Sequence, residues 1–186
     1  MRRAGPLTAM ALLAVLVLAA CGDGGSSGAP SGAGVSSGAL DARVERFTVN
    51  SANHVNGQVN YAQTPPVGGD HNAAWLNCGY YPQAVIVEMA VHSMEHGAVW
   101  VTYRPSLPSD QVDILRAFAR SNRYVLVSPW ADDTLPAPVV ASAWGLQVQA
   151  GTAEDPVVAA FVETYANGPQ TPEPGAPCSG GVGSPS

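Results

Sequence analysis

The sequence predicts an α+β domain, in which helices pack on a mostly antiparallel or mixed sheet. Three observations lead to this prediction. Apolar residues recur with the period of a helix in the late part of the chain, and short runs that are apolar on both faces alternate with them, as buried strands do. The regular segments follow in the order α-β-α-β-β-α. We therefore expect one two-layer domain over residues 42–178, with a long irregular section at its N-terminal end.

The irregular section is expected to end in a stiff loop. Residues 42–49 alternate weakly between polar and apolar side chains and are predicted to form a first strand. In the segment 64–71, two prolines fix the backbone φ angle and two glycines allow tight turns, directly before His71. This loop should therefore hold His71 in a defined place.

The regular half of the domain begins with a helix that Pro82 is well placed to open and Gly97 to end. The predicted elements are, in order, a helix over 84–97, a strand over 98–103, a helix over 109–121, a strand over 124–128, a strand over 139–149 with a bulge at Trp144-Gly145, and a helix that starts at Asp155-Pro156 and stops at Asn167-Gly168-Pro169.

The first 21 residues have the pattern of a bacterial lipoprotein signal. Arg2 and Arg3 precede an apolar run from Leu7 to Ala20, and small residues stand directly before Cys21. This pattern resembles the lipobox, which implies cleavage after residue 20 and lipid attachment to the Cys21 thiol. We expect an anchored protein at the outer face of the cytoplasmic membrane or in the periplasm. A plain secretory peptide or an uncleaved membrane anchor is the alternative.

Composition predicts a tether and a tail around the domain. Residues 21–41 are rich in Gly and Ser and should form a flexible linker, and residues 179–186 are expected to be disordered. From Cys21 onward the chain carries six arginines, no lysine and fourteen acidic residues, a net charge of −8. This acidity repels phosphate backbones and excludes nucleic acid as a partner, whereas it attracts cations.

Two cysteines remain once Cys21 carries lipid, and they leave two interpretations open. Cys78 and Cys178 can pair in an oxidising compartment, which would tie the late, loose part of the chain to the domain. Alternatively, Cys78 stays reduced and binds a metal ion. The two interpretations exclude each other.

A metal site is predicted at the segment Ala90 to Tyr103. On a helix, His92 and His96 share one face about 6 Å apart, whereas on a strand they would lie about 13 Å apart. Met89 falls on the same helical stripe. A mixture of imidazole and thioether ligands favours copper, with zinc as the alternative. The further candidate ligands are His71, then His54, and Met94.

The five residues His92 to His96 also permit other functions. Residues 92–96 fit H-x-x-E-H, the inverted zinc-protease motif in which two helical histidines bind zinc and the glutamate activates water. In that alternative Glu95 is the catalytic base of a small zinc hydrolase. Glu95 can also orient a histidine, and His96 can cap the end of the helix. A third alternative is a structural or protein-interaction module without metal.

Several ordered motifs between Val44 and Cys178 resemble the bacterial family named domain of unknown function 3105. The motifs are Pro65-Pro66-Val67-Gly68-Gly69-Asp70-His71, Cys78-Gly79-Tyr80-Tyr81, His92-Ser93-Met94-Glu95-His96-Gly97-Ala98-Val99, Tyr103-Arg104-Pro105, Ser142-Ala143-Trp144-Gly145, and Pro172-Glu173-Pro174 before Cys178. The resemblance implies a secreted, lipid-anchored or membrane-tethered protein without an established activity. It also favours a joint role for His71, His92, Glu95 and His96.

Taken together, the sequence favours a lipid-anchored, extracytoplasmic protein that binds copper and serves in metal binding, delivery or tolerance rather than in turnover. Its expected partners are the membrane, through the lipid, the metal ion, and a protein to which the ion is passed.

Overall fold

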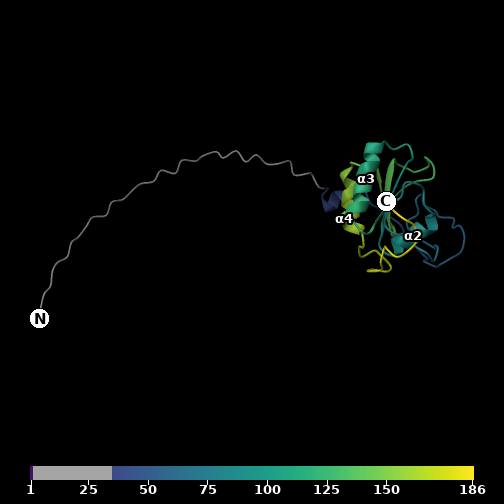
Figure 1. Ribbon diagram of the computed structural model, residues 1–186, viewed down its shortest axis with the longest axis horizontal. Coiled ribbons are helices and arrows are strands. Elements are labelled where there is room, and N and C mark those ends of the chain that lie inside the picture. Colours follow the sequence, from purple (N-terminus) through teal and green to yellow (C-terminus); the bar gives the residue numbers. More distant parts are fainter. Residues whose placement is uncertain (2–34) are drawn as a thin grey trace. The chain divides into compact units, whose positions relative to one another are not determined.

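The computed structural model describes residue 1 and residues 35–186 (Figure 1). Residues 2–34 therefore lie outside the described residues, and with them nearly all of the predicted signal peptide, the predicted lipidation site Cys21 and most of the predicted linker. Within the described part, no helix is both long enough and apolar enough to cross a membrane.

A six-stranded mixed sheet with the order β1-β6-β5-β3-β4-β2 forms the centre of the domain. Strand β3 pairs with β4 in parallel and with β5 in antiparallel orientation. The α+β class and the mixed sheet are thus confirmed. The strands are β1 (Glu45–Arg46), β2 (Gly79–Tyr80), β3 (Val99–Tyr103), β4 (Val125–Pro129), β5 (Val139–Ala143) and β6 (Leu146–Ala150).

Helices α3 (Ser109–Ser121) and α4 (Pro156–Tyr165) cover one face of the sheet, and the short α1 (Ser37–Asp41) contacts α4 (Figure 1). The strands direct alternate residues to this face, so that Val99 and Val101 pack in one apolar cluster with Leu115 and Phe161. Each of these four side chains is buried. This face is the main hydrophobic core of the domain.

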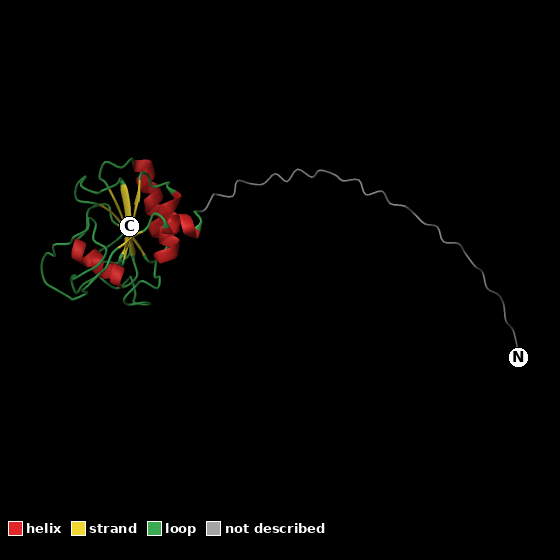
Figure 2. Cartoon of the chain, turned by 180° about the vertical axis from the view of Figure 1, so that it is seen from behind, coloured by secondary structure: helices red, strands yellow, loops and turns green. Residues whose placement is uncertain are grey.

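Helix α2 (Val87–Glu95) and the long loops cover the opposite face, so helices flank the strands on both sides (Figure 2). The intervening residues of the strands, Trp100 and Leu126, form a second apolar cluster with Val91 and Met94 of α2. The sheet is therefore enclosed by a third layer, which the two-layer prediction did not include.

Two predicted boundaries differ from the structure. Residues 139–149 form a hairpin rather than one bulged strand, because Gly145 adopts a φ of +70° and lets the chain reverse between β5 and β6. The predicted linker range 21–41 also extends into the domain, because Ser37–Asp41 is helical and Leu40 is buried in the main core.

The C-terminal segment is ordered, contrary to the predicted disordered tail over residues 179–186. Cys78 and Cys178 form a disulfide, so Cys78 is not a free thiolate. Beyond it, Val182 pairs with Leu76 in a parallel bridge, and the Ser186 backbone N–H donates to the Tyr80 carbonyl at 2.9 Å. Backbone hydrogen bonds and the disulfide hold this segment in place, because its glycine and serine residues offer little side chain for packing.

Candidate metal centre

The end of helix α2 positions His92, Glu95 and His96 on one face. The Gly97 N–H donates to the Met94 carbonyl and the Ala98 N–H to the Ser93 carbonyl, which is the Schellman arrangement. Gly97 adopts a φ of +104°, a conformation that favours glycine. The helix therefore ends where the sequence predicts, and the three side chains project at i, i+3 and i+4.

A β-bridge in the loops brings His54 beside His71. The Val55 N–H donates to the His71 carbonyl at 2.7 Å, and the His71 N–H donates to the Asn53 carbonyl at 2.9 Å. The Asp70 carboxylate accepts from the backbone and the side chain of Asn53, both at 3.0 Å, and the backbone hydrogen bond is the main cause that lowers the pKa of Asp70. This ladder fixes two loops that are far from helix α2 in sequence.

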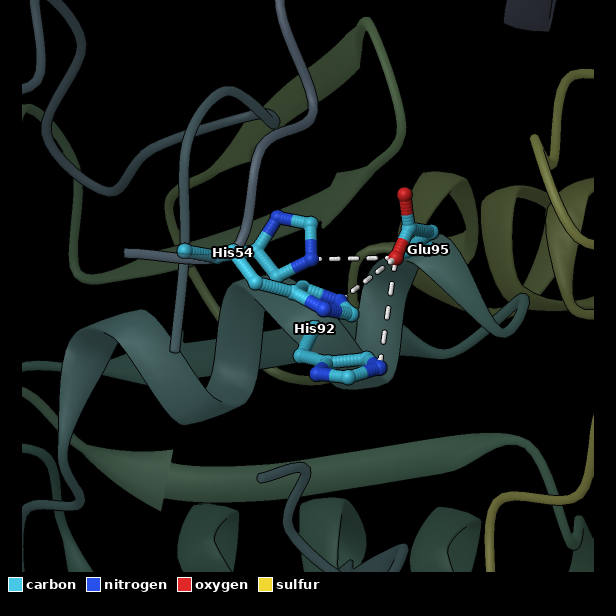
Figure 3. Close-up of side chains that lie close together, drawn as sticks. His54, His92 and Glu95 are labelled. Atoms are coloured by element: carbon cyan, nitrogen blue, oxygen red, sulfur yellow. Dashed lines mark ion pairs between the residues drawn. The ribbon is translucent and has the colours of Figure 1, made fainter. Parts of the chain in front are cut away.

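His54, His71, His92 and Glu95 converge on one point, with ligand atoms that all lie within 4.8 Å of one another. Glu95 Oε2 is 3.0 Å from His71 Nε2, and 3.9 Å from the Nε2 atoms of both His54 and His92. Figure 3 shows the rings of His54 and His92 turned towards the Glu95 carboxylate. We call these four residues the inner site, and they could hold a metal ion.

The inner site is enclosed on all but one side. His71, His92 and Glu95 are buried, whereas the His54 side chain is 52% exposed. The Trp75 ring lies 5.6 Å from the His92 ring, and the Trp144 ring lies 6.1 Å from the His71 ring. An ion in this site would thus meet solvent at His54.

Backbone carbonyls fix the tautomers of the three buried imidazoles. The Nδ1 atoms of His71, His92 and His96 lie 2.8, 2.7 and 2.9 Å from the carbonyl oxygens of Gly69, Asn72 and Pro177. Because a carbonyl can only accept, each Nδ1 carries the proton and each Nε2 presents a lone pair. Histidines that bind metals are oriented by such hydrogen bonds on their other ring nitrogen.

These lone pairs face other acceptors rather than donors. His71 Nε2 is buried and makes no hydrogen bond, although Glu95 Oε2 is 3.0 Å away. The pKa of His92 is lowered from 6.5 to about 4, mainly by burial and to a smaller extent by the neighbouring imidazoles. His92 is therefore neutral at neutral pH, as a metal ligand must be. A cation at the centre of the inner site would compensate the lone pairs of His71 and His92 at once.

The methionines predicted as ligands lie elsewhere. Met94 is fully buried in the second apolar cluster, because a residue two positions from both His92 and His96 points away from their face of the helix. Met89 packs against the same cluster and lines a hollow of about 810 Å³, whose lining includes none of the histidines.

Glu173 belongs to this region and was not among the predicted site residues. Its Oε2 lies 3.5 Å from His96 Nε2, and its backbone N–H donates to the Glu95 carbonyl at 3.2 Å. His96 itself is in contact with the inner site through His92, because the two Nε2 atoms are 3.1 Å apart. The only signal in the sequence was the motif Pro172-Glu173-Pro174.

Comparison with known proteins identifies one family. The family model described as "Protein of unknown function (DUF3105)" matches residues 54–180, a stretch that contains every residue of the inner site and both cysteines of the disulfide. No curated protein and no solved structure matches the chain.

Proposed function

The chain belongs to the DUF3105 family, as its motifs predicted, and from this premise we propose that it is a lipid-anchored, extracytoplasmic protein that binds a divalent transition-metal ion in the inner site. Its role in this proposal is to bind the ion and deliver it to a protein partner, or to provide metal tolerance.

One observation carries this proposal. Two buried imidazoles with fixed tautomers and one solvent-facing imidazole surround a single buried carboxylate, and His71 Nε2 has no hydrogen-bond donor to satisfy it. An unsatisfied buried polar atom is costly, and here it faces a buried carboxylate at 3.0 Å. A bound cation would turn this unfavourable arrangement into a favourable one.

The donor set favours a divalent ion of borderline character. Three imidazoles and one carboxylate suit copper(II) and zinc(II), and copper(II) binds more tightly at a site of given nitrogen and oxygen ligands. Copper(I) would favour the thioethers, but Met94 lies in the apolar cluster. We therefore propose copper(II) as the physiological ion, with zinc(II) as the alternative.

Binding is favoured over hydrolysis by the position of Glu95. In the H-x-x-E-H motif the glutamate activates a water molecule beside the metal, whereas here its Oε2 lies among the imidazole nitrogens, as a ligand does. The disulfide between Cys78 and Cys178 supports a location outside the cytoplasm, because such bonds persist in oxidising compartments.

The test is metal retention by the full-length protein, purified in detergent. After loading with copper(II) or zinc(II) and dialysis, elemental analysis should find tightly bound metal in the wild type. His71→Ala and Glu95→Gln should lose it, whereas Glu163→Gln, which neutralises an exposed carboxylate on α4, should keep it. Equal retention in all variants would refute the inner site.

A thermal melt separates metal binding from a purely structural role of the histidines. Free ion at 1,000 times its Kd should stabilise the folded state by about 4.1 kcal/mol, and a chelator should remove this gain. A melting temperature that is the same with metal and with chelator would favour the structural module instead.

A further inference from the structure

We propose that His96 and Glu173 form a second, outer metal position beside the inner site, with His92 between the two. This inference rests on the proposed function, because the outer position has a purpose only if the inner site holds an ion. It would take the same class of ligand, a divalent first-row transition ion.

His96 is prepared as a ligand in the same way as the inner histidines. Its ring is buried, and its Nδ1–H donates to the Pro177 carbonyl at 2.9 Å. Its Nε2 therefore carries a lone pair. Yet His96 is not one of the four residues whose ligand atoms converge in the inner site. A buried and oriented imidazole is thus left over once the inner site is complete.

The neighbours of His96 Nε2 are the ones that a metal position requires. Glu173 Oε2 lies 3.5 Å away, and His92 Nε2 lies 3.1 Å away. Donors that bind one ion at about 2.1 Å are separated by about 3.0 to 3.4 Å in octahedral or tetrahedral geometry. The separation of 3.1 Å lies within this range, and the separation of 3.5 Å lies just beyond it. The short distance between two nitrogen lone pairs also calls for a positive charge between or beside them.

The Glu173 carboxylate is carried by a fixed segment. The Glu173 N–H donates to the Glu95 carbonyl at 3.2 Å, and the Tyr124 hydroxyl donates to the Ala176 carbonyl at 2.9 Å. The disulfide at Cys178 ties the same segment to Cys78. The backbone is therefore held from both sides while the carboxylate projects outward, with a side chain that is 57% exposed.

Exposure distinguishes the two positions in chemical terms. The inner site offers four protein ligands, three of them buried, whereas the outer position offers His96 and Glu173, with water to complete the coordination. The single lone pair on His92 Nε2 can bind only one ion at a time, so His92 serves either position in turn. Fewer ligands and more water mean weaker binding and faster exchange. The outer position would load and unload the inner site through His92.

Zinc titration of the full-length protein in detergent tests this proposal, with calorimetry and elemental analysis as the readouts. We expect two ions per chain in the wild type, one tight and one weaker, and a single tight ion in Glu173→Gln and in His96→Gln. Glu154→Gln, which alters an exposed carboxylate near the start of α4, should retain both. Because Glu173 is exposed, its substitution should leave the fold intact, which a thermal melt checks.

The rate at which a chromogenic chelator removes the tight ion gives a second measurement. Glu173→Gln should slow this removal by about 10-fold or more, in keeping with the usual effect of residues around a metal site. One ion in the wild type, or two ions that persist in Glu173→Gln, would overturn the outer position and leave the inner site standing. No ion in any variant would refute the proposed function as well.

Discussion

The two faces of the sheet are built in different ways. On the face covered by α3 and α4, the buried residues of the strands are apolar and form one large cluster. On the face covered by α2, the buried residues of the strands include four polar ones: Thr102, Ser128, Ser142 and Gln147. Gln147 donates to the Ser142 hydroxyl and to the carbonyl of Pro65 in a loop, whereas Thr102 and Ser128 hydrogen-bond within the sheet. All the residues of the inner site lie on this second face, in α2 and its loops.

This difference teaches where stability and function reside in the molecule. Burial of apolar area stabilises the α3/α4 face without any ligand. The α2 face combines a smaller apolar cluster with buried His71, His92 and Glu95, and the disulfide and backbone hydrogen bonds hold it. It is the face that a bound ion would complete.

The largest effect should come from breaking the disulfide. Cys78→Ser combined with Cys178→Ser opens a loop of 100 residues, and the chain-entropy estimate gives a loss of up to about 4.7 kcal/mol in the free energy of unfolding. Metal affinity should fall in parallel, because Pro177 and Glu173 lose their anchor. Denaturant titration and calorimetry measure the two quantities. Unchanged metal affinity in this variant would show that the metal-binding geometry of the α2 face does not depend on the disulfide.

A substitution that creates a cavity in the main core, under α3 and α4, should lower stability without changing metal binding. Phe161→Ala empties a fully buried position of the main core and should lower the free energy of unfolding by about 3 to 4 kcal/mol. At a temperature where this variant stays folded, its metal stoichiometry and affinity should equal those of the wild type. If the affinity dropped as well, the stability of the main core and metal binding on the α2 face would be coupled.

The smallest expected effect is a pH dependence of the free energy of unfolding, which arises from His92 on the α2 face. Burial lowers the pKa of His92 from 6.5 to about 4, so the unfolded chain binds more protons than the folded chain between these two values. The metal-free protein should therefore lose stability as the pH falls from about 6.5 to 4, by at most about 1.4 kcal/mol per pH unit from this residue.

Melts of the metal-free protein at pH 7 and pH 5.5 measure this dependence. His92→Gln should reduce the difference between the two pH values, whereas Phe161→Ala should leave that difference unchanged. If the wild type became more stable as the pH fell, the predicted direction of the pH dependence would be wrong.

Periodicity predicted the α3/α4 face well because local sequence decides it. Helix α3 begins and ends at the predicted residues, and the side chain of Asp155 caps α4 by accepting from the Val157 N–H at 3.0 Å. Gly97 stops helix α2 as expected, shortly after Glu95. Pro82 does not open the helix, which begins at Val87 with Ile86 as its N-cap rather than at Ala84.

The arrangement of the α2 face depends on contacts between segments that lie far apart in the sequence, which local patterns do not predict. Helical spacing placed His92, Glu95 and His96 on one face, yet no local pattern foretells that Val55 and His71 pair through their backbones. Glu173 escaped prediction because its proximity to His96 follows from the disulfide and the Pro177 carbonyl, not from its neighbours. Val182 shows the same limit, since its order comes from strand pairing with Leu76.

The bridge between His54 and His71 has a consequence for how the protein assembles. An ion held jointly by these loops and by α2 would act as a cross-link, closing the segment from His54 to Glu95 much as the disulfide closes the segment from Cys78 to Cys178. The two closures overlap along the chain. Metal uptake would then be the last step of maturation, and until that step the loops would be the part of the domain most open to proteases.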